Sequence, residues 1–273
     1  MHRRIRYTKG FYISAIKTAI NGTHNIRTPF VKGGLCPVYF ADTDSNTVVF
    51  RFSSQDLAEH NTNIGKLLHE YDISAPLSNV HTYSDLWFET YKYNPNETLF
   101  ETIQSGANKQ QIKNIYNQIL NIQIKMSEIP LQYIPSTKLS KYPDLFRAMQ
   151  QFNLHPLLTS VYTGVIKTVS CVGKRRLVHN DLNPKNVLIT PDKNVSGILD
   201  LDSVGISSES FAMMMLLRSY PYTDYGELLD YYEDNTKRNL HRRAILMGVN
   251  MLAKIRNTRQ KIEQMMGTPP KIR

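Results

Sequence analysis

Three polar residues before an apolar run carry the clearest chemical signal in the chain. His179, Asp181 and Asn186 have the spacing His-x-Asp-x4-Asn, and Asp200 follows later in Ile198-Leu199-Asp200. Phosphoryl transfer needs a carboxylate beside the attacking hydroxyl and further oxygen ligands for the metal on the triphosphate. The residue types and their spacing therefore predict a phosphoryl-transfer site.

Each of these residues has an expected role. Asp181, at the apex of a short loop, accepts or orients the proton of the acceptor hydroxyl. Asn186 and Asp200 offer an amide and a carboxylate oxygen, which suit the preference of Mg²⁺ for oxygen ligands. His179 packs beneath the loop and holds its backbone by hydrogen bonds. The predicted catalytic residues are Asp181, Asn186, Asp200 and His179, and the predicted metal ligands are Asn186 and Asp200.

The local elements explain why distant residues would meet. Residues 187–189 are apolar and strand-like, residues 191–194 form a turn, and residues 195–201 return as a second strand. Such a hairpin brings Asp200 back across from Asn186. The alternative is an ordinary hairpin with Asp and Asn in its turns, where both residue types are common.

The rest of the chain changes character along its length. Its first third is rich in expected strands with one helix, and the remainder is mainly helical. We therefore predict an α+β fold with a small antiparallel-sheet N-terminal lobe, residues 1–92, a larger helical C-terminal lobe, residues 93–273, and a ligand cleft between them. The expected strands are 47–52 and 86–91, beside an apolar segment 30–40 and a turn at 42–46; the expected helices are 55–71, 109–126, 144–169 with an interruption near His155-Pro156, and a region from Ser208 onward.

The segment His179-Asn180-Asp181…Asn186 with Ile198-Leu199-Asp200 resembles the aminoglycoside phosphotransferase and choline kinase superfamily. The Asn between His and Asp, followed by Leu182-Asn183-Pro184, is most similar to the bacterial choline, ethanolamine and thiamine kinase branch. The resemblance implies a bilobal protein-kinase-like fold, ATP and Mg²⁺ as cofactors, and transfer of phosphate to a hydroxyl of a small molecule.

The resemblance extends into the first lobe. Residues 32–39 resemble the family's glycine-containing phosphate loop, with Gly33 and Gly34 as cofactor-binding residues, although a plain turn is the alternative. Pro37 departs from the family, which often has Asn there. Arg51 occupies the place of the strand cation that contacts the α- and β-phosphates, and a solvated strand charge is its alternative.

Further nucleotide contacts are expected around Arg51. Glu59 is the predicted helix carboxylate that pairs with Arg51, and Glu70 is the poorer alternative. The segment from Glu89 to Tyr91 is the predicted hinge between lobes, whose backbone groups would read adenine. Glu89 and Tyr91 therefore join the predicted cofactor-binding residues.

The acceptor is expected to be choline-, ethanolamine- or thiamine-like, or aminoglycoside-like. The rival interpretation is a nucleotide-binding regulatory pseudokinase without turnover, suggested by the departures at Pro37 and Lys125. A protein kinase is disfavoured because Leu201-Asp202 follows Asp200 and no Ala-Pro-Glu segment ends an activation loop.

Composition sets the wider expectations. The chain has 33 Lys and Arg residues against 23 Asp and Glu, a net charge of +10, without the spacing of a known nucleic-acid motif. We interpret this as a basic surface suited to nucleotides rather than to nucleic acid. Two cysteines, Cys36 and Cys171, and the lack of a signal or membrane-spanning run predict a cytoplasmic protein. The oligomeric state is left open.

Overall fold

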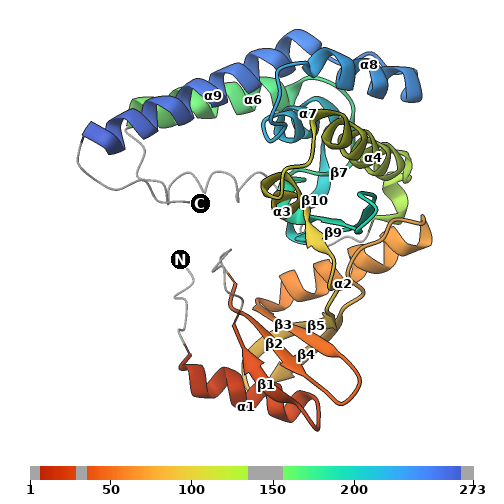
Figure 1. Cartoon of the computed structure of the whole chain (residues 1–273), viewed down its shortest axis with the longest axis vertical. Coiled ribbons are helices and arrows are strands. Elements are labelled where there is room, and N and C mark those ends of the chain that lie inside the picture. The colour runs from red at the N-terminus through yellow and green to blue at the C-terminus, as the bar shows by residue number, and fades with distance from the viewer. Residues whose placement is uncertain (1–6, 29–35, 135–155, 266–273) are drawn as a thin grey trace. The chain divides into compact units, whose positions relative to one another are not determined.

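The chain divides into two compact units, Met1–Pro95 and Asn96–Arg273. A computed structural model describes residues 7–28, 36–134 and 156–265 (Figure 1). The first unit holds an antiparallel sheet and the second is mainly helical, so the predicted α+β organisation is confirmed. The division follows Pro95, whereas the sequence predicts a lobe boundary after residue 92.

The first unit is built on one antiparallel sheet with the strand order β1-β2-β3-β5-β4. A helix precedes the sheet and a second helix follows its third strand. The elements are α1 (Lys9–Ala19), β1 (His24–Arg27), β2 (Val38–Asp42), β3 (Thr47–Ser53), α2 (Gln55–Glu70), β4 (Asn79–Tyr83) and β5 (Leu86–Lys92).

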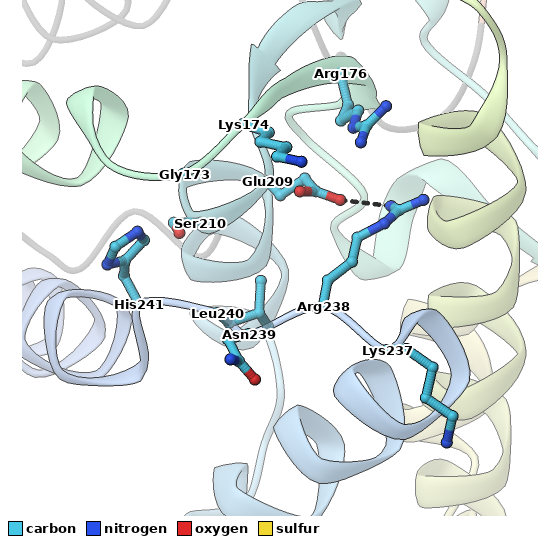
Figure 2. A pocket seen from close by; sticks show the side chains of 10 residues that line it. All are labelled: Gly173, Lys174, Arg176, Glu209, Ser210, Lys237, Arg238, Asn239, Leu240 and His241. Atoms are coloured by element: carbon cyan, nitrogen blue, oxygen red, sulfur yellow. Dashed lines mark hydrogen bonds and ion pairs between the residues drawn. The ribbon is translucent and has the colours of Figure 1, made fainter.

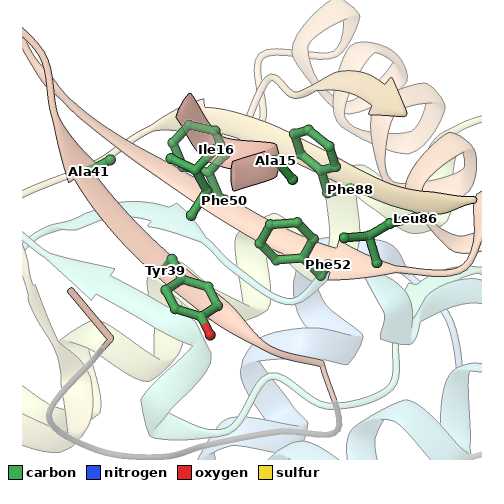
Figure 3. Close-up of a cluster of buried hydrophobic side chains, with 8 residues drawn as sticks. All are labelled: Ala15, Ile16, Tyr39, Ala41, Phe50, Phe52, Leu86 and Phe88. Carbon is green, nitrogen blue, oxygen red and sulfur yellow. The ribbon is translucent and has the colours of Figure 1, made fainter. Parts of the chain in front are cut away.

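One face of this sheet forms the core of the first unit together with α1. Successive side chains of a strand point to opposite faces, so Phe50, Phe52 and Phe88 share the face that packs against Ala15 and Ile16 (Figure 3). The rings of Phe52 and Phe88 lie with centroids 5.0 Å apart. This aromatic layer fixes the register of the two central strands.

The alternate residues of β3 and β5 lie on the face that meets α2. Arg51 pairs in register with Glu89, and Asn61 of α2 donates a hydrogen bond to Glu89. Helix α2 buries Ile64 and Leu68. The period of two along the strands thus separates an aromatic face from a charged one.

The second unit contains two small sheets within a shell of helices. Strands β10 and β7 form one sheet, and β6, β8 and β9 form the other. The elements are β6 (Glu97–Thr98), α3 (Leu99–Gln104), α4 (Lys109–Glu128), the 3₁₀ turn η1 (Leu131–Tyr133), α6 (Pro156–Cys171), β7 (Arg175–His179), η2 (Pro184–Asn186), β8 (Val187–Ile189), β9 (Val195–Ile198), η3 (Leu201–Ser203), β10 (Val204–Ser208), α7 (Glu209–Leu217), α8 (Tyr225–Thr236) and α9 (Arg242–Met265).

Helix α7 is the centre of the second unit, since every one of its residues is buried. It packs against α6, α9 and β7, and α9 runs alongside α6 (Figure 1). The apolar run Met213–Leu217 within α7 is buried in the core. Methionine suits such a site because its flexible side chain fills irregular gaps.

Some elements differ from the sequence prediction. Helix α1 and strand β4 were not predicted, although turn residues follow both, Asn21-Gly22 after α1 and Ser84-Asp85 after β4. The second strand of the predicted hairpin ends at Ile198 and not at Leu201. Of the expected helix 144–169, residues 144–155 lie outside the described residues, and α6 begins at Pro156. Among the described helices, none has the length and apolar character that crossing a membrane requires.

The packing of α1 on the sheet yields a stability prediction. Replacing the fully buried Ile16 by Ala should lower the free energy of unfolding of the first unit by about 2–5 kcal/mol, because a cavity remains beneath the sheet. Urea unfolding followed by the fluorescence of Trp87, the only tryptophan in the chain, reports on β5 directly. The exposed neighbour Lys17→Ala is the control, and equal stability of both variants would contradict this packing.

Candidate active site

The loop between β7 and β8 is organised around the buried ring of His179, which is 1% exposed. The backbone N–H of Asp181 donates to Nδ1 of this ring at 3.1 Å. Since Nδ1 accepts, the proton of the neutral ring sits on Nε2, which donates to the carbonyl oxygen of Leu199 at 2.9 Å. One imidazole therefore ties the loop of Asp181 to the strand end that leads to Asp200.

Burial lowers the pKa of His179 below its ordinary value, although hydrogen bonding to Leu199 and the charges of Asp181 and Asp202 oppose this shift. The hydrogen-bond pattern agrees with a neutral ring. A second proton, on Nδ1, would face the N–H of Asp181. His179 thus links the loop to Leu199 by hydrogen bonds from its ring.

Gln123 of helix α4 holds the backbone of His179 by two hydrogen bonds. Its Oε1 accepts from the backbone N–H of His179 at 3.1 Å, and its Nε2 donates to the carbonyl of His179 at 3.2 Å. The sequence predicts a helix over 109–126 but does not single out Gln123. Ile122 is half-buried and Gln123 is buried. The signal in the sequence was the position of Gln123, a polar residue directly after the apolar Ile122.

Asn186 joins the loop to the hairpin. Its Nδ2 donates to the carbonyl of Asp181 at 2.8 Å, and its own carbonyl accepts from the N–H of Leu199 at 2.8 Å. With Nδ2 committed to the backbone, the amide presents Oδ1 as its remaining group, and no hydrogen bond to Oδ1 occurs among the described residues. The structure therefore brings the segments of Asp181, Asn186 and Asp200 together through backbone contacts.

Asp200 lies beyond the end of β9 and has a left-handed backbone, with φ of 60° and ψ of 57°. The sequence predicted it at the end of a strand, which is wrong. Left-handed geometry is unfavourable for most residues and is tolerated best by Gly, Asn and Asp. It turns the chain sharply into η3, where the N–H of Ser203 donates to the carbonyl of Asp200 at 3.2 Å.

The oxygen atoms here fit the predicted metal in kind. Asp200 is exposed and offers a carboxylate oxygen, and Asn186 offers a neutral amide oxygen. Both are hard ligands that suit Mg²⁺. Within the described residues no group of three or more His, Cys, Asp and Glu side chains could hold an ion by itself. Two protein ligands are compatible with Mg²⁺, which commonly takes its remaining ligands from phosphates and water.

Arg218, directly after α7, is a second residue that sequence reasoning missed. Its guanidinium lies 3.8 Å from a carboxylate oxygen of Asp181, and both side chains are about one-third exposed. An ion pair this exposed contributes at most about 1 kcal/mol to stability. It does place positive charge beside the carboxylate. Its sequence context, one cation after an apolar helix, gave no signal.

In the first unit, Arg51 pairs with a different carboxylate from the one predicted. Its guanidinium lies 2.9 Å from Glu89 on the neighbouring strand, and the Glu89 side chain is 3% exposed. Asn61 of α2 donates to the same Glu89 oxygen at 2.8 Å. Glu59 instead accepts a hydrogen bond from Gln55. The paired carboxylate is thus supplied by strand β5 in cross-strand register, and helix α2 adds the amide of Asn61.

The predicted hinge is also corrected. Glu89, Thr90 and Tyr91 lie inside β5, paired with Arg51, Phe50 and Val49 of β3. Glu89 and Thr90 pair with β4 as well, so their backbone groups belong to the sheet. The strand ends at Lys92. Gly33 and Gly34 lie outside the described residues.

The chain resembles a known family in sequence and known proteins in fold. Residues 27–246 match the sequence model described as "Phosphotransferase enzyme family". No curated protein matches the chain in sequence.

Solved structures match over nearly the whole chain. The GDP and kanamycin complex of APH(2″)-IIIa has 16% identity and a TM-score of 0.69, covering 95% of this chain and 93% of that chain. Macrolide 2′-phosphotransferase MphH from Brachybacterium faecium has 17% identity and a TM-score of 0.57, covering 97% and 100%. Choline kinase LicA from Streptococcus pneumoniae has 11% identity and a TM-score of 0.61, covering 93% and 91%. These likenesses confirm the protein-kinase-like fold.

The two contacts of Gln123 lead to a prediction about the loop. Gln123→Ala leaves the buried N–H and carbonyl of His179 without partners, which costs about 1–3 kcal/mol for each group. The variant should be less stable, and the amide of His179 should exchange its hydrogen faster. Hydrogen exchange with mass spectrometry measures this for the peptide containing His179. Gln110→Ala, an exposed change on the same helix, is the control, and equal protection in both variants would contradict the role of Gln123.

Proposed function

Since the chain belongs to the phosphotransferase enzyme family, we propose that it transfers the γ-phosphoryl group of ATP to a hydroxyl of a small molecule. The observation that carries the proposal is the hydrogen-bonded loop in which His179 and Asn186 hold the backbone beside Asp181 and Asp200. Asp181, Asn186 and Asp200, to which we assign the chemistry, are all present in the chain. No observation favours the regulatory interpretation without turnover.

The proposed roles follow from the position of each group. Asp181 accepts the hydrogen bond of the acceptor hydroxyl and aligns its oxygen with the γ-phosphorus. Arg218, next to Asp181, stabilises negative charge that develops on the transferred group. Asn186 and Asp200 would hold Mg²⁺, which would neutralise charge on the triphosphate. Positioning and preorganised charge supply the acceleration.

We propose that Arg51 contacts the nucleotide phosphates. Its planar guanidinium has five N–H donors, so one edge can bind Glu89 while others face phosphate oxygens. Glu89 would then orient the guanidinium rather than bind nucleotide itself. Related solved structures include complexes with GDP and with ADP, so GTP is the natural competitor to test against ATP.

The acceptor class is a small hydroxylated molecule, either choline-like or aminoglycoside-like. Related structures are described as kanamycin and spectinomycin complexes, macrolide phosphotransferases and a choline kinase. Their acceptors share an alcohol group and not a common shape. The closeness to the choline, ethanolamine and thiamine kinase branch stays a prediction. We place the protein in the cytoplasm on the same basis.

Variants of Asp181 and Asp200 should distinguish phosphoryl transfer from nucleotide binding. Asp181→Asn should reduce phosphoryl transfer roughly 10²–10⁴-fold while the affinity for the nucleotide is unchanged, because the amide cannot accept the hydroxyl proton. Asp200→Asn should weaken binding of the magnesium nucleotide as well, because it removes a charged ligand. Release of ADP with a panel of amino-alcohols, vitamins, aminoglycosides and macrolides measures transfer, and calorimetry measures binding.

Asp192→Asn, an exposed change in the turn of the same hairpin, is the matched control and should leave both quantities unchanged. Full transfer by the Asp181→Asn variant would overturn the proposed mechanism. If ATP and GTP bind but no acceptor stimulates turnover, the regulatory alternative gains instead.

The pair of Arg51 and Glu89 allows stability to be separated from binding. Arg51→Gln leaves Glu89 buried without its cation and should cost about 3–5 kcal/mol of stability. The double variant Arg51→Gln/Glu89→Gln removes both charges and should recover most of that loss. Nucleotide affinity should fall roughly tenfold or more in both variants, because the phosphate-binding cation is gone.

Unfolding curves and calorimetry on the same samples measure the two effects. Lys92→Gln, an exposed change on β5, is the control for loss of one positive charge. Restored nucleotide affinity in the double variant would show that Arg51 is structural and does not bind phosphate.

A further inference from the structure

The second unit contains a pocket of about 510 Å³ that lies outside the catalytic loop. Its lining includes Gly173, Lys174, Arg176, Glu209, Ser210 and Arg238 (Figure 2). Arg176 belongs to β7, whose other end is His179. The strand rises about 3.3 Å per residue, so the pocket and the catalytic loop are separated by roughly 10 Å along one short strand.

The pocket has an excess of positive charge. Lys174, Arg176, Lys237 and Arg238 line it, and Glu209 is its one acidic residue. Figure 2 shows Lys174, Arg176 and Arg238 gathered around Glu209, while the ammonium group of Lys237 points away from them.

Glu209 does not neutralise Lys174 and Arg176, because its carboxylate is paired with Arg238. One carboxylate oxygen accepts from Arg238 at 2.7 Å and from the hydroxyl of Tyr232 at 3.0 Å. The side chains of Lys174 and Arg176 make no hydrogen bond or ion pair within the described part of the chain, and Nε of Arg176 is buried without a partner. A buried donor of this kind is costly unless a ligand or water satisfies it.

Ser210 supplies an independent indication of a ligand. It is 1% exposed, lines the pocket, and its hydroxyl has no hydrogen-bond partner. Gly173 lies against it with φ of 92°, and a Cβ at that position would approach the Ser210 hydroxyl to 3.1 Å. A larger residue would therefore crowd the buried hydroxyl as well as strain the backbone.

From these groups we propose a second ligand site, which binds a phosphate group of a small phosphorylated molecule. Lys174 and Arg176 supply unpaired positive charge, and the hydroxyl of Ser210 supplies a neutral donor. Such a combination suits the several acceptor oxygens of a phosphate. The volume is typical of small-molecule pockets. A concave site lined by a buried serine favours a small anion over the backbone of a nucleic acid.

The site is tested with pyrophosphate as the probe, titrated calorimetrically into the full chain without magnesium. Arg176→Gln should raise the dissociation constant for pyrophosphate at least fivefold, because it removes about one charge-assisted hydrogen bond. The matched control is Arg175→Gln, the same change at the neighbouring exposed residue, whose side chain points to the other face of the strand. It should change the dissociation constant by less than about twofold.

A second arm separates this site from the proposed nucleotide site. The variant Arg51→Gln/Glu89→Gln should still bind pyrophosphate, since neither residue lines the pocket. Ser210→Ala should also weaken binding while leaving the net charge unchanged.

Defined results overturn the proposal. It fails if pyrophosphate does not bind at millimolar concentration, if Arg175→Gln and Arg176→Gln weaken binding equally, or if binding disappears in the Arg51→Gln/Glu89→Gln variant. A short single-stranded RNA is the last arm. Binding of this RNA that depends on Arg176, without binding of pyrophosphate, would assign the cations to nucleic acid and overturn the small-molecule site.

Discussion

The neutral, buried imidazole of His179 is the contact on which the geometry of the candidate site depends. It accepts from the N–H of Asp181 and donates to the carbonyl of Leu199, so one ring links two backbone segments that are eighteen residues apart. Such a link requires a group with one donor and one acceptor on opposite sides, which a neutral histidine provides. Burial lowers the pKa of His179 and so favours the neutral ring that this pair of hydrogen bonds requires.

In the first unit, the sheet holds the mostly buried cation of Arg51. Burying a charge is costly unless it is paired, so Arg51 needs a carboxylate beside it. The cross-strand register of β3 and β5 supplies Glu89 at the facing position, and Asn61 adds a hydrogen bond from α2. The alternation that places Phe50 and Phe52 in the core necessarily turns Arg51 toward the helix.

The local parts of this structure could be predicted from the sequence, and the long-range parts could not. The hairpin of β8 and β9 and helix α4 follow from apolar periodicity and turn residues, and the spacing of Asp181, Asn186 and Asp200 predicts that their segments meet. The partner of Arg51 depends on which strands pair, and that register is invisible in a single segment. Glu59 was chosen for its place on a helix, whereas Glu89 is selected by the sheet.

The two-stranded sheet of β7 and β10 connects the candidate active site with the proposed second ligand site. Val204 pairs with His179 at one end, and Ser208 pairs with Arg175 at the other. Between them the strands are held by a continuous ladder and by buried Leu177 and Val178, which leaves little room to move one end alone. Glu209 and Ser210 follow β10 directly, just as Asn180 and Asp181 follow β7. The proposed phosphate site and the loop of Asp181 therefore lie at opposite ends of one element, the two-stranded sheet.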